Sequence, residues 1–119
     1  MAMWIGVAAV SGMIAVIAGA FGAHGLRDNV SADQLSAWTT GAQYHLLHSV
    51  VLLALALFAM RTEAPIRVPA SLFLAGIVLF SGSIYLLVLT EQRWLGPVTP
   101  LGGLCLIAGW ASLLWLARP

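Results

Sequence analysis

Long apolar segments alternate with short polar ones along the chain, and four of the apolar segments have the length of a membrane span. The polar breaks fall at about residues 26–30, 61–68 and 91–98. A helix needs about 20 apolar residues to cross the hydrocarbon core of a bilayer. We therefore predict an all-α integral membrane protein in which residues 1–119 form one domain, a four-transmembrane-helix bundle. Its spans are expected at about residues 2–23, 41–60, 69–90 and 99–117.

The second helix is predicted to begin well before its membrane span. Ser31-Ala32-Asp33-Gln34 has the pattern of a capping box, in which the first and fourth side chains cap the helix start. A helix from there to about Met60 is longer than the hydrocarbon core, so we expect residues 31–40 to form an interfacial helical extension. Trp38 fits the aromatic belt of such an interface. Gly25 is expected to end the first helix in a left-handed conformation.

Composition supports a lipid environment. The 119 residues are 61% hydrophobic and 8% charged, and their mean hydropathy is +1.00. A soluble domain carries roughly 25% charged residues, which this chain lacks. The net charge of +1 gives no reason to expect nucleic acid as a partner. The partner that the composition indicates is the lipid bilayer, and no cofactor is indicated.

The arginines suggest an orientation in the membrane. With four spans, both termini lie on the same side, together with Arg61, Arg67 and Arg118, and the opposite side carries Arg27 and Arg93. Basic residues are more frequent in cytoplasmic loops. This difference favours both termini in the cytoplasm, in a bacterial cytoplasmic (inner) membrane.

Polar side chains inside the spans are the candidates for a site, because they are costly in lipid. One stripe of the second helix carries Gln34, Trp38, Gly41, His45 and His48 at spacings of three and four residues. The first and third helices bring further polar groups toward the same membrane end. We therefore predict a cluster in one half of the bilayer. Its candidate ligand-binding residues are His24, Tyr44, His45, His48, Ser81, Ser83 and Tyr85.

The histidines have three readings. Neutral imidazole binds zinc, copper or iron, so His24, His45 and His48 are weak candidates for a metal site. They also suit hydrogen bonds to neighbouring helices, or a proton relay or ligand contact. The sequence has no nucleophile and base at an identifiable spacing, so an enzyme is not predicted. A face of small residues on the fourth helix suits close packing; it consists of Gly102, Cys105, Gly109 and Ser112.

Four short motifs resemble those of the YgdD-type family, small uncharacterised multi-pass membrane proteins of bacteria with mitochondrial relatives. The motifs are Gly19-Ala20-Phe21-Gly22-Ala23-His24-Gly25-Leu26, Gln43-Tyr44-His45-Leu46-Leu47-His48-Ser49, Leu79-Phe80-Ser81-Gly82-Ser83-Ile84-Tyr85 and Thr99-Pro100-Leu101-Gly102-Gly103. The resemblance implies several transmembrane helices and no established activity. It carries over to His24, Tyr44, His48, Ser81, Gly82, Tyr85, Pro100 and Gly102. At position 45 the resemblance leads us to expect Gln, which does not favour a metal ligand but still forms hydrogen bonds.

Three functional hypotheses remain open. The first is a non-enzymatic helical bundle that acts by association, as a homo-oligomer or as an accessory subunit of a larger membrane complex. The second is a small carrier or binder of an ion, a proton or a lipid-like ligand, using the polar cluster. The third is a metal-binding membrane protein.

Overall fold

The computed structural model describes residues 2–118, which are mostly helical and contain no β-strand. Four helical rods in this range are long and apolar enough to cross a membrane, which confirms the predicted fold class. The first rod is α1 (Ala2–Phe21) with the π-helical turn η1 (Gly22–Leu26), and the second is α2 (Ala32–Thr62). The third rod consists of α3 (Arg67–Gly76), the π-helical turn η2 (Ile77–Gly82) and α4 (Ser83–Thr90). The fourth is the short η3 (Arg93–Leu95) followed by α5 (Val98–Leu116).

The predicted start of the second helix is confirmed in detail. Ser31 accepts a hydrogen bond from the backbone N–H of Gln34, and the Gln34 side chain accepts one from the backbone N–H of Ser31. The helix then runs for 31 residues without a break. At 1.5 Å per residue this is about 46 Å, against a hydrocarbon core of about 30 Å.

The predicted end of the first helix is wrong. Gly25 does not adopt a left-handed conformation, and the helix continues through a π-helical turn to Leu26. The side chain of Asn29 then donates a hydrogen bond to the carbonyl of Gly25, 2.8 Å away. A side chain thus satisfies the helix end where we expected a backbone reversal at glycine.

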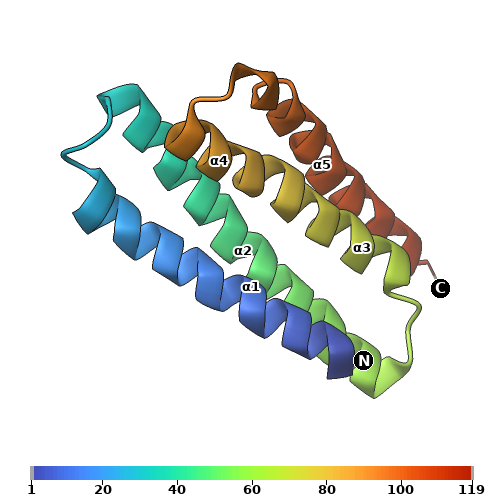
Figure 1. Cartoon of the computed structure of the whole chain (residues 1–119). Helices are drawn as coiled ribbons and strands as arrows, with labels where there is room; N and C mark the ends of the chain where they lie inside the picture. Colours follow the sequence, from blue (N-terminus) through green and yellow to red (C-terminus); the bar gives the residue numbers. More distant parts are fainter. Residues whose placement is uncertain (1, 119) are drawn as a thin grey trace.

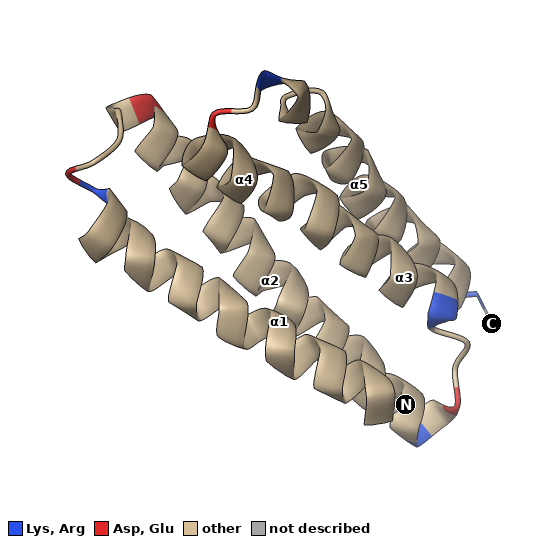
Figure 2. Cartoon of the chain, viewed as in Figure 1, with Lys and Arg blue, Asp and Glu red and all other residues tan. Residues whose placement is uncertain are grey.

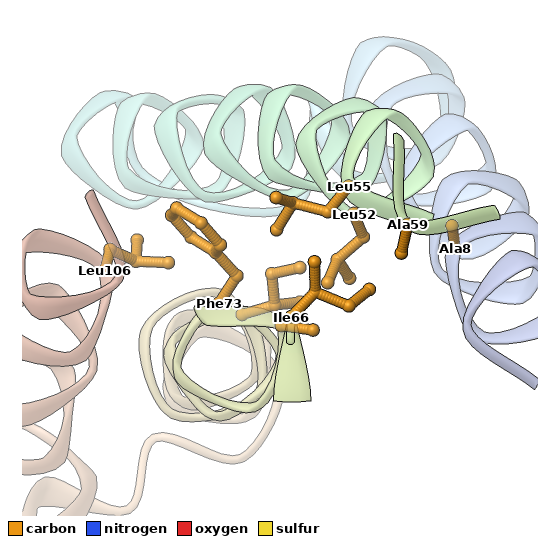
Figure 3. Close-up of a cluster of buried hydrophobic side chains, with 9 residues drawn as sticks. Ala8, Leu52, Leu55, Ala59, Ile66, Phe73 and Leu106 are labelled. Carbon is orange, nitrogen blue, oxygen red and sulfur yellow. The ribbon is translucent and has the colours of Figure 1, made fainter. Parts of the chain in front are cut away.

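The four rods run up and down in a skewed bundle (Figure 1). Both termini lie at the same end as the connection between α2 and α3 (Figure 1). α1 packs along α2, and α3 and η2 pack against α5, while α2 contacts the α3–η2–α4 rod. α1 and α5 therefore flank a central pair of rods on opposite sides, as the view of the core shows (Figure 3).

The main hydrophobic core lies near the terminal end of the bundle and joins all four rods (Figure 3). Phe73 and Leu52 are completely buried at its centre. The α1 side of the interface with α2 uses small residues: its buried positions are Ala8, Ser11, Ala15 and Ala18. Small side chains let helix backbones approach closely, which is the usual basis of helix association in lipid.

The small-residue face of the fourth helix packs inside the chain. A Cβ atom at Gly102 would overlap the backbone of Leu79 and Phe80 in η2. At Gly109 it would lie 2.8 Å from the ring of Phe73. These glycines therefore allow α5 to lie directly against the third rod.

Trp38 is not an interfacial anchor, which corrects the sequence prediction. Its side chain is only 4% exposed and lies between helices. The indole N–H donates to the backbone carbonyl of Ala18 at 2.7 Å, and the ring packs against Phe21 and Tyr85. Burying the indole is feasible because its one polar group finds a partner on α1.

Candidate ligand-binding site

His45 is the centre of a hydrogen-bonded chain that links three helices. Its Nδ1 lies 2.9 Å from the hydroxyl of Tyr85 on α4, and its Nε2 lies 3.1 Å from the hydroxyl of Ser11 on α1. Ser11 in turn lies 2.6 Å from the hydroxyl of Ser49. Ser49 donates to the backbone carbonyl of His45, 2.7 Å away, one helical turn earlier. This hydrogen-bonded chain therefore runs from Tyr85 on α4 through His45 and Ser11 to Ser49, and it ends at a backbone carbonyl of α2.

The sequence explains why these side chains meet. His45 and Ser49 are four residues apart and so share one face of α2. Ser11 lies on the small-residue face of α1, and its side chain is small enough to pack directly against α2. His45, Ser11 and Ser49 are all buried. Their positions near the middle of α1 and α2 place this chain deep in the bundle, where the hydrogen bonds compensate for the lack of water.

A groove runs beside this chain, between α1 and the third rod. Its volume is about 570 Å³. Most of its lining is aliphatic or glycine, and its polar members are Ser11, His45 and Tyr85. The complete lining is Gly6, Val7, Val10, Ser11, Ile14, His45, Leu74, Ile77, Val78, Gly82 and Tyr85. We call this the α1–α4 groove.

His48 belongs to a different environment, on the α5 side of the third rod. Its Nδ1 lies 2.8 Å from the carbonyl of Tyr44, and the indole N–H of Trp110 donates to its Nε2 at 3.1 Å. Aromatic rings surround it: Phe73 and Trp110 lie within 6.0 Å of the imidazole, centroid to centroid. A carbonyl only accepts, so Nδ1 carries the hydrogen and Nε2 is the acceptor. His48 is thus a neutral ring with both nitrogens occupied.

The three histidines do not converge, so the predicted metal site is not formed. His24 is exposed in the turn η1, while His45 and His48 use their ring nitrogens in separate hydrogen bonds. Within residues 2–118 no three His, Cys, Asp or Glu side chains are grouped closely enough to hold a metal ion.

Three other predicted site residues make contacts away from the α1–α4 groove. Ser81 donates to the carbonyl of Gly41 at 2.7 Å, and Ser83 lies 2.5 Å from the hydroxyl of Thr99. Both are ties between helices. Tyr44 is half exposed and stacks on His48. Of the predicted cluster, only His45 and Tyr85 lie together at a groove.

Ser11 and Ser49 belong to the hydrogen-bonded chain but were absent from the predicted cluster, although the sequence indicated both. Ser11 is the one polar side chain inside the first span, and an isolated polar residue in lipid needs a partner. Ser49 follows His45 by one turn and therefore had to share its face. The hydrogen-bonded chain from Ser11 to Ser49 lies near the middle of α1 and α2, and the gathering of polar groups in one half of the bilayer stays a prediction.

Comparison with known proteins places the chain in a family. The model of a family described as "Protein of unknown function (DUF423)" matches residues 18–103. The inner membrane protein YgdD of Escherichia coli K12, named UPF0382, is 44% identical over 108 residues, which cover 90% of this chain and 82% of that protein. The UPF0382 membrane protein YwdK of Bacillus subtilis is 40% identical over 116 residues, covering 96% and 94%.

A UPF0382 membrane protein of Staphylococcus saprophyticus is 41% identical over 114 residues, which cover 96% of this chain and 95% of the relative. No solved structure matches the chain. The resemblance found in the four sequence motifs is confirmed. The chain belongs to the DUF423 family of membrane proteins, whose function is unknown.

Proposed function

We propose that this membrane protein binds a lipid-like molecule in the α1–α4 groove, with the polar end of the molecule at the chain formed by Ser11, His45 and Tyr85. The observation that supports the proposal is this buried polar chain, which lies along an otherwise aliphatic groove. Polar groups within a membrane span are costly and commonly mark ligand or ion sites. A groove with apolar walls and a few polar groups is the usual form of a small-molecule site.

The dimensions of the groove suit one hydrocarbon chain. Its volume of about 570 Å³ lies within the usual range of small-molecule sites, about 300–1,000 Å³. On α1 it extends from Gly6 to Ile14, which is about 12 Å at 1.5 Å per residue. On the third rod it extends from Leu74 to Tyr85, or about 16 Å by the same rise. This is about half of the hydrocarbon core, and the groove opens between helices where lipid has access.

A purely structural role for the polar chain is the alternative. The bond between Ser81 and Gly41 shows what such a tie looks like here, because it joins two helices and neither residue lines the α1–α4 groove. In contrast, three successive members of the His45 chain line the groove. This difference favours a ligand.

The test is photolabelling of purified protein with a long-chain alcohol that carries a diazirine in its tail. We expect crosslinks to concentrate on the peptides of residues 6–14 and 74–85. Two groove glycines have open space where a Cβ would lie, Gly6 and Gly82. Filling the groove by Gly6→Leu or Gly82→Leu should abolish most of the labelling, and at both positions the added Cβ has no neighbour within 4 Å.

Gly19→Leu is the matched control for Gly6→Leu. Gly19 also lies on α1 with open space at its Cβ position, but it does not line the α1–α4 groove. Labelling of this variant should equal that of the wild type. Crosslinks spread evenly over all lipid-facing residues, or unchanged labelling in both filled variants, would contradict the proposal.

The hypothesis of association rested on faces of small residues, among them that of the fourth helix, and on the lack of a water-exposed domain. Because Gly102 and Gly109 pack against the third rod of the same chain, this face no longer argues for contact with a second chain. Homo-oligomerisation and a role as an accessory subunit stay hypotheses.

We also propose that both termini lie in the cytoplasm. The charged residues are confined to the two ends of the bundle (Figure 2). The terminal end carries three arginines and one glutamate, a net side-chain charge of +2; they are Arg61, Glu63, Arg67 and Arg118. The opposite end carries two arginines and three acidic residues, a net charge of −1; they are Arg27, Asp28, Asp33, Glu91 and Arg93. The excess of arginine at the terminal end supports this orientation.

A further inference from the structure

Each hydrogen bond in the chain at His45 has a definite donor and acceptor. The bond from Ser49 to a backbone carbonyl determines all the others. Ser49 lies 2.7 Å from the backbone carbonyl of His45, and a carbonyl oxygen only accepts. The single hydroxyl hydrogen of Ser49 is therefore used in this bond. Between Ser49 and Ser11, 2.6 Å apart, Ser49 must then be the acceptor and Ser11 the donor.

The same argument continues along the chain to the groove. Ser11 has used its hydrogen on Ser49, so it accepts from Nε2–H of His45. No carboxylate is among the hydrogen-bond partners of His45, and a buried charge without a partner is costly, so the ring is neutral. A neutral ring with Nε2–H has an acceptor at Nδ1. Tyr85 must therefore donate its hydroxyl hydrogen to His45, 2.9 Å away.

As a result, every O–H and side-chain N–H of this hydrogen-bonded chain already donates a hydrogen bond within it. Only oxygen lone pairs remain to bind a ligand. From this geometry we infer that the molecule in the α1–α4 groove carries a hydrogen-bond donor at its polar end, as a long-chain alcohol does, which donates to the hydroxyl oxygen of Tyr85. This inference rests on the proposed function. A molecule whose polar end only accepts, such as an ether or ester, finds no free donor there and leaves its own oxygen unpaired.

The first test compares two probes that differ only in the donor. A diazirine-bearing long-chain alcohol and its methyl ether are each photolabelled onto the wild-type protein at a series of concentrations. We expect the alcohol to bind roughly three- to tenfold more tightly, the effect of one hydrogen bond inside a membrane protein. Equal binding of both probes in the groove would overturn the inference and leave the proposed function intact. If neither probe labels the groove, the proposed function itself fails.

A second test changes the direction of the chain from outside the groove. Ser49 does not line the groove, and Ser49→Ala removes the acceptor that holds the hydrogen of Ser11. Ser11 is then free to donate to Nε2 of His45, the imidazole hydrogen moves to Nδ1, and Tyr85 is free to donate to the ligand. The preference for the alcohol over the ether should fall to one or reverse. An unchanged preference in a well-folded variant would contradict the assigned direction.

His45→Gln and His45→Leu are the paired controls at the centre of the chain. A glutamine side chain ends in one acceptor and one donor, so it can accept from Tyr85 and donate to Ser11 as the neutral imidazole does. His45→Gln should keep the preference for the alcohol, and His45→Leu should lose it. Loss of the preference in both variants, with both well folded, would mean that the donor and acceptor pattern at position 45 is not what selects the ligand.

Discussion

The two histidines of α2 are three residues apart, yet they form hydrogen bonds with different helices. His45 joins α1 to α4 through hydroxyl groups and lies at a groove, whereas His48 joins α2 to α5 through the indole of Trp110. The tautomer of His48 is determined by its partners, since one nitrogen faces a carbonyl and the other faces an N–H donor. The same stripe of α2 thus contains His45, a candidate ligand contact, and His48, which holds α2 and α5 together.

The tie at His48 leads to a prediction at the scale of one residue. Trp110→Phe removes the donor to Nε2 of His48 and leaves this buried acceptor unpaired. We expect the free energy of unfolding to fall by about 1 kcal/mol, measured by SDS titration in mixed micelles. Trp115→Phe is the control, because Trp115 is 71% exposed and should have almost no effect. Equal losses in the two variants would argue that ring packing, and not the hydrogen bond, matters at position 110.

Residue identities were predictable where the partner is close in sequence, and not where it is distant. The capping box of Ser31 and Gln34 spans three residues and was predicted correctly. The partner of His45 on α1 is 34 residues away, and that of Trp38 is 20 residues away. Only the packing of α1 on α2 brings these groups together, which is why Trp38 was wrongly assigned to the membrane interface.

Among the elements, the third rod has an irregular turn in its interior. It includes the π-helical turn η2 between α3 and α4. π-helical turns are rare and are often found at functional sites. Here the backbone of η2 lies directly on Gly102 of α5, and the same turn contributes Ile77, Val78 and Gly82 to the α1–α4 groove. The turn therefore shapes one wall of the groove while its other side is held by α5.

Close contact between η2 and α5 leads to a prediction at this scale. Gly102→Ala places a methyl group inside the backbone of Phe80, which can be relieved only by separating the two helices. We expect a loss of about 1–3 kcal/mol in the free energy of unfolding, the usual cost of overpacking. It is measured by the same SDS titration.

The neighbouring glycine provides the control. A Cβ atom at Gly103 would lie 3.9 Å from the ring of Phe80, which is an ordinary contact. Gly103→Ala should therefore be neutral, or slightly stabilising because alanine favours the helix. If Gly102→Ala were equally harmless, the close approach of η2 to α5 would be refuted.

At the scale of the whole molecule, the bundle is about 50 Å long and its charged residues lie at the two ends (Figure 2). That length exceeds a hydrocarbon core of about 30 Å, so both ends reach into the polar region of the membrane. The α1 and α5 rods lie on opposite sides of the central pair (Figure 3). This open arrangement, unlike a closed square bundle, leaves the α1–α4 groove between rods that are not packed against each other.

The orientation of the bundle gives a whole-molecule prediction. In a Cys105→Ala background, single cysteines at Ala32 and at Gln92 should react with a membrane-impermeant thiol reagent added outside intact bacterial cells. Cysteines at Thr62 and at Pro65 should react only after the membrane is permeabilised. The reason is the excess of arginine at the terminal end, which favours its retention in the cytoplasm. The opposite labelling pattern would show that the termini face outward.

The sequence by itself determined the number of helices, their approximate ends and the placement of charge, because the lengths of apolar segments and the helix caps are local properties. It did not determine which face of each helix is buried. In lipid, both the packed and the exposed faces of a helix are apolar, so hydrophobic periodicity does not mark the inward side. Only the tertiary structure decided that His45 meets Ser11 and Tyr85, that His48 meets Trp110, and that a groove lies beside the first of these groups.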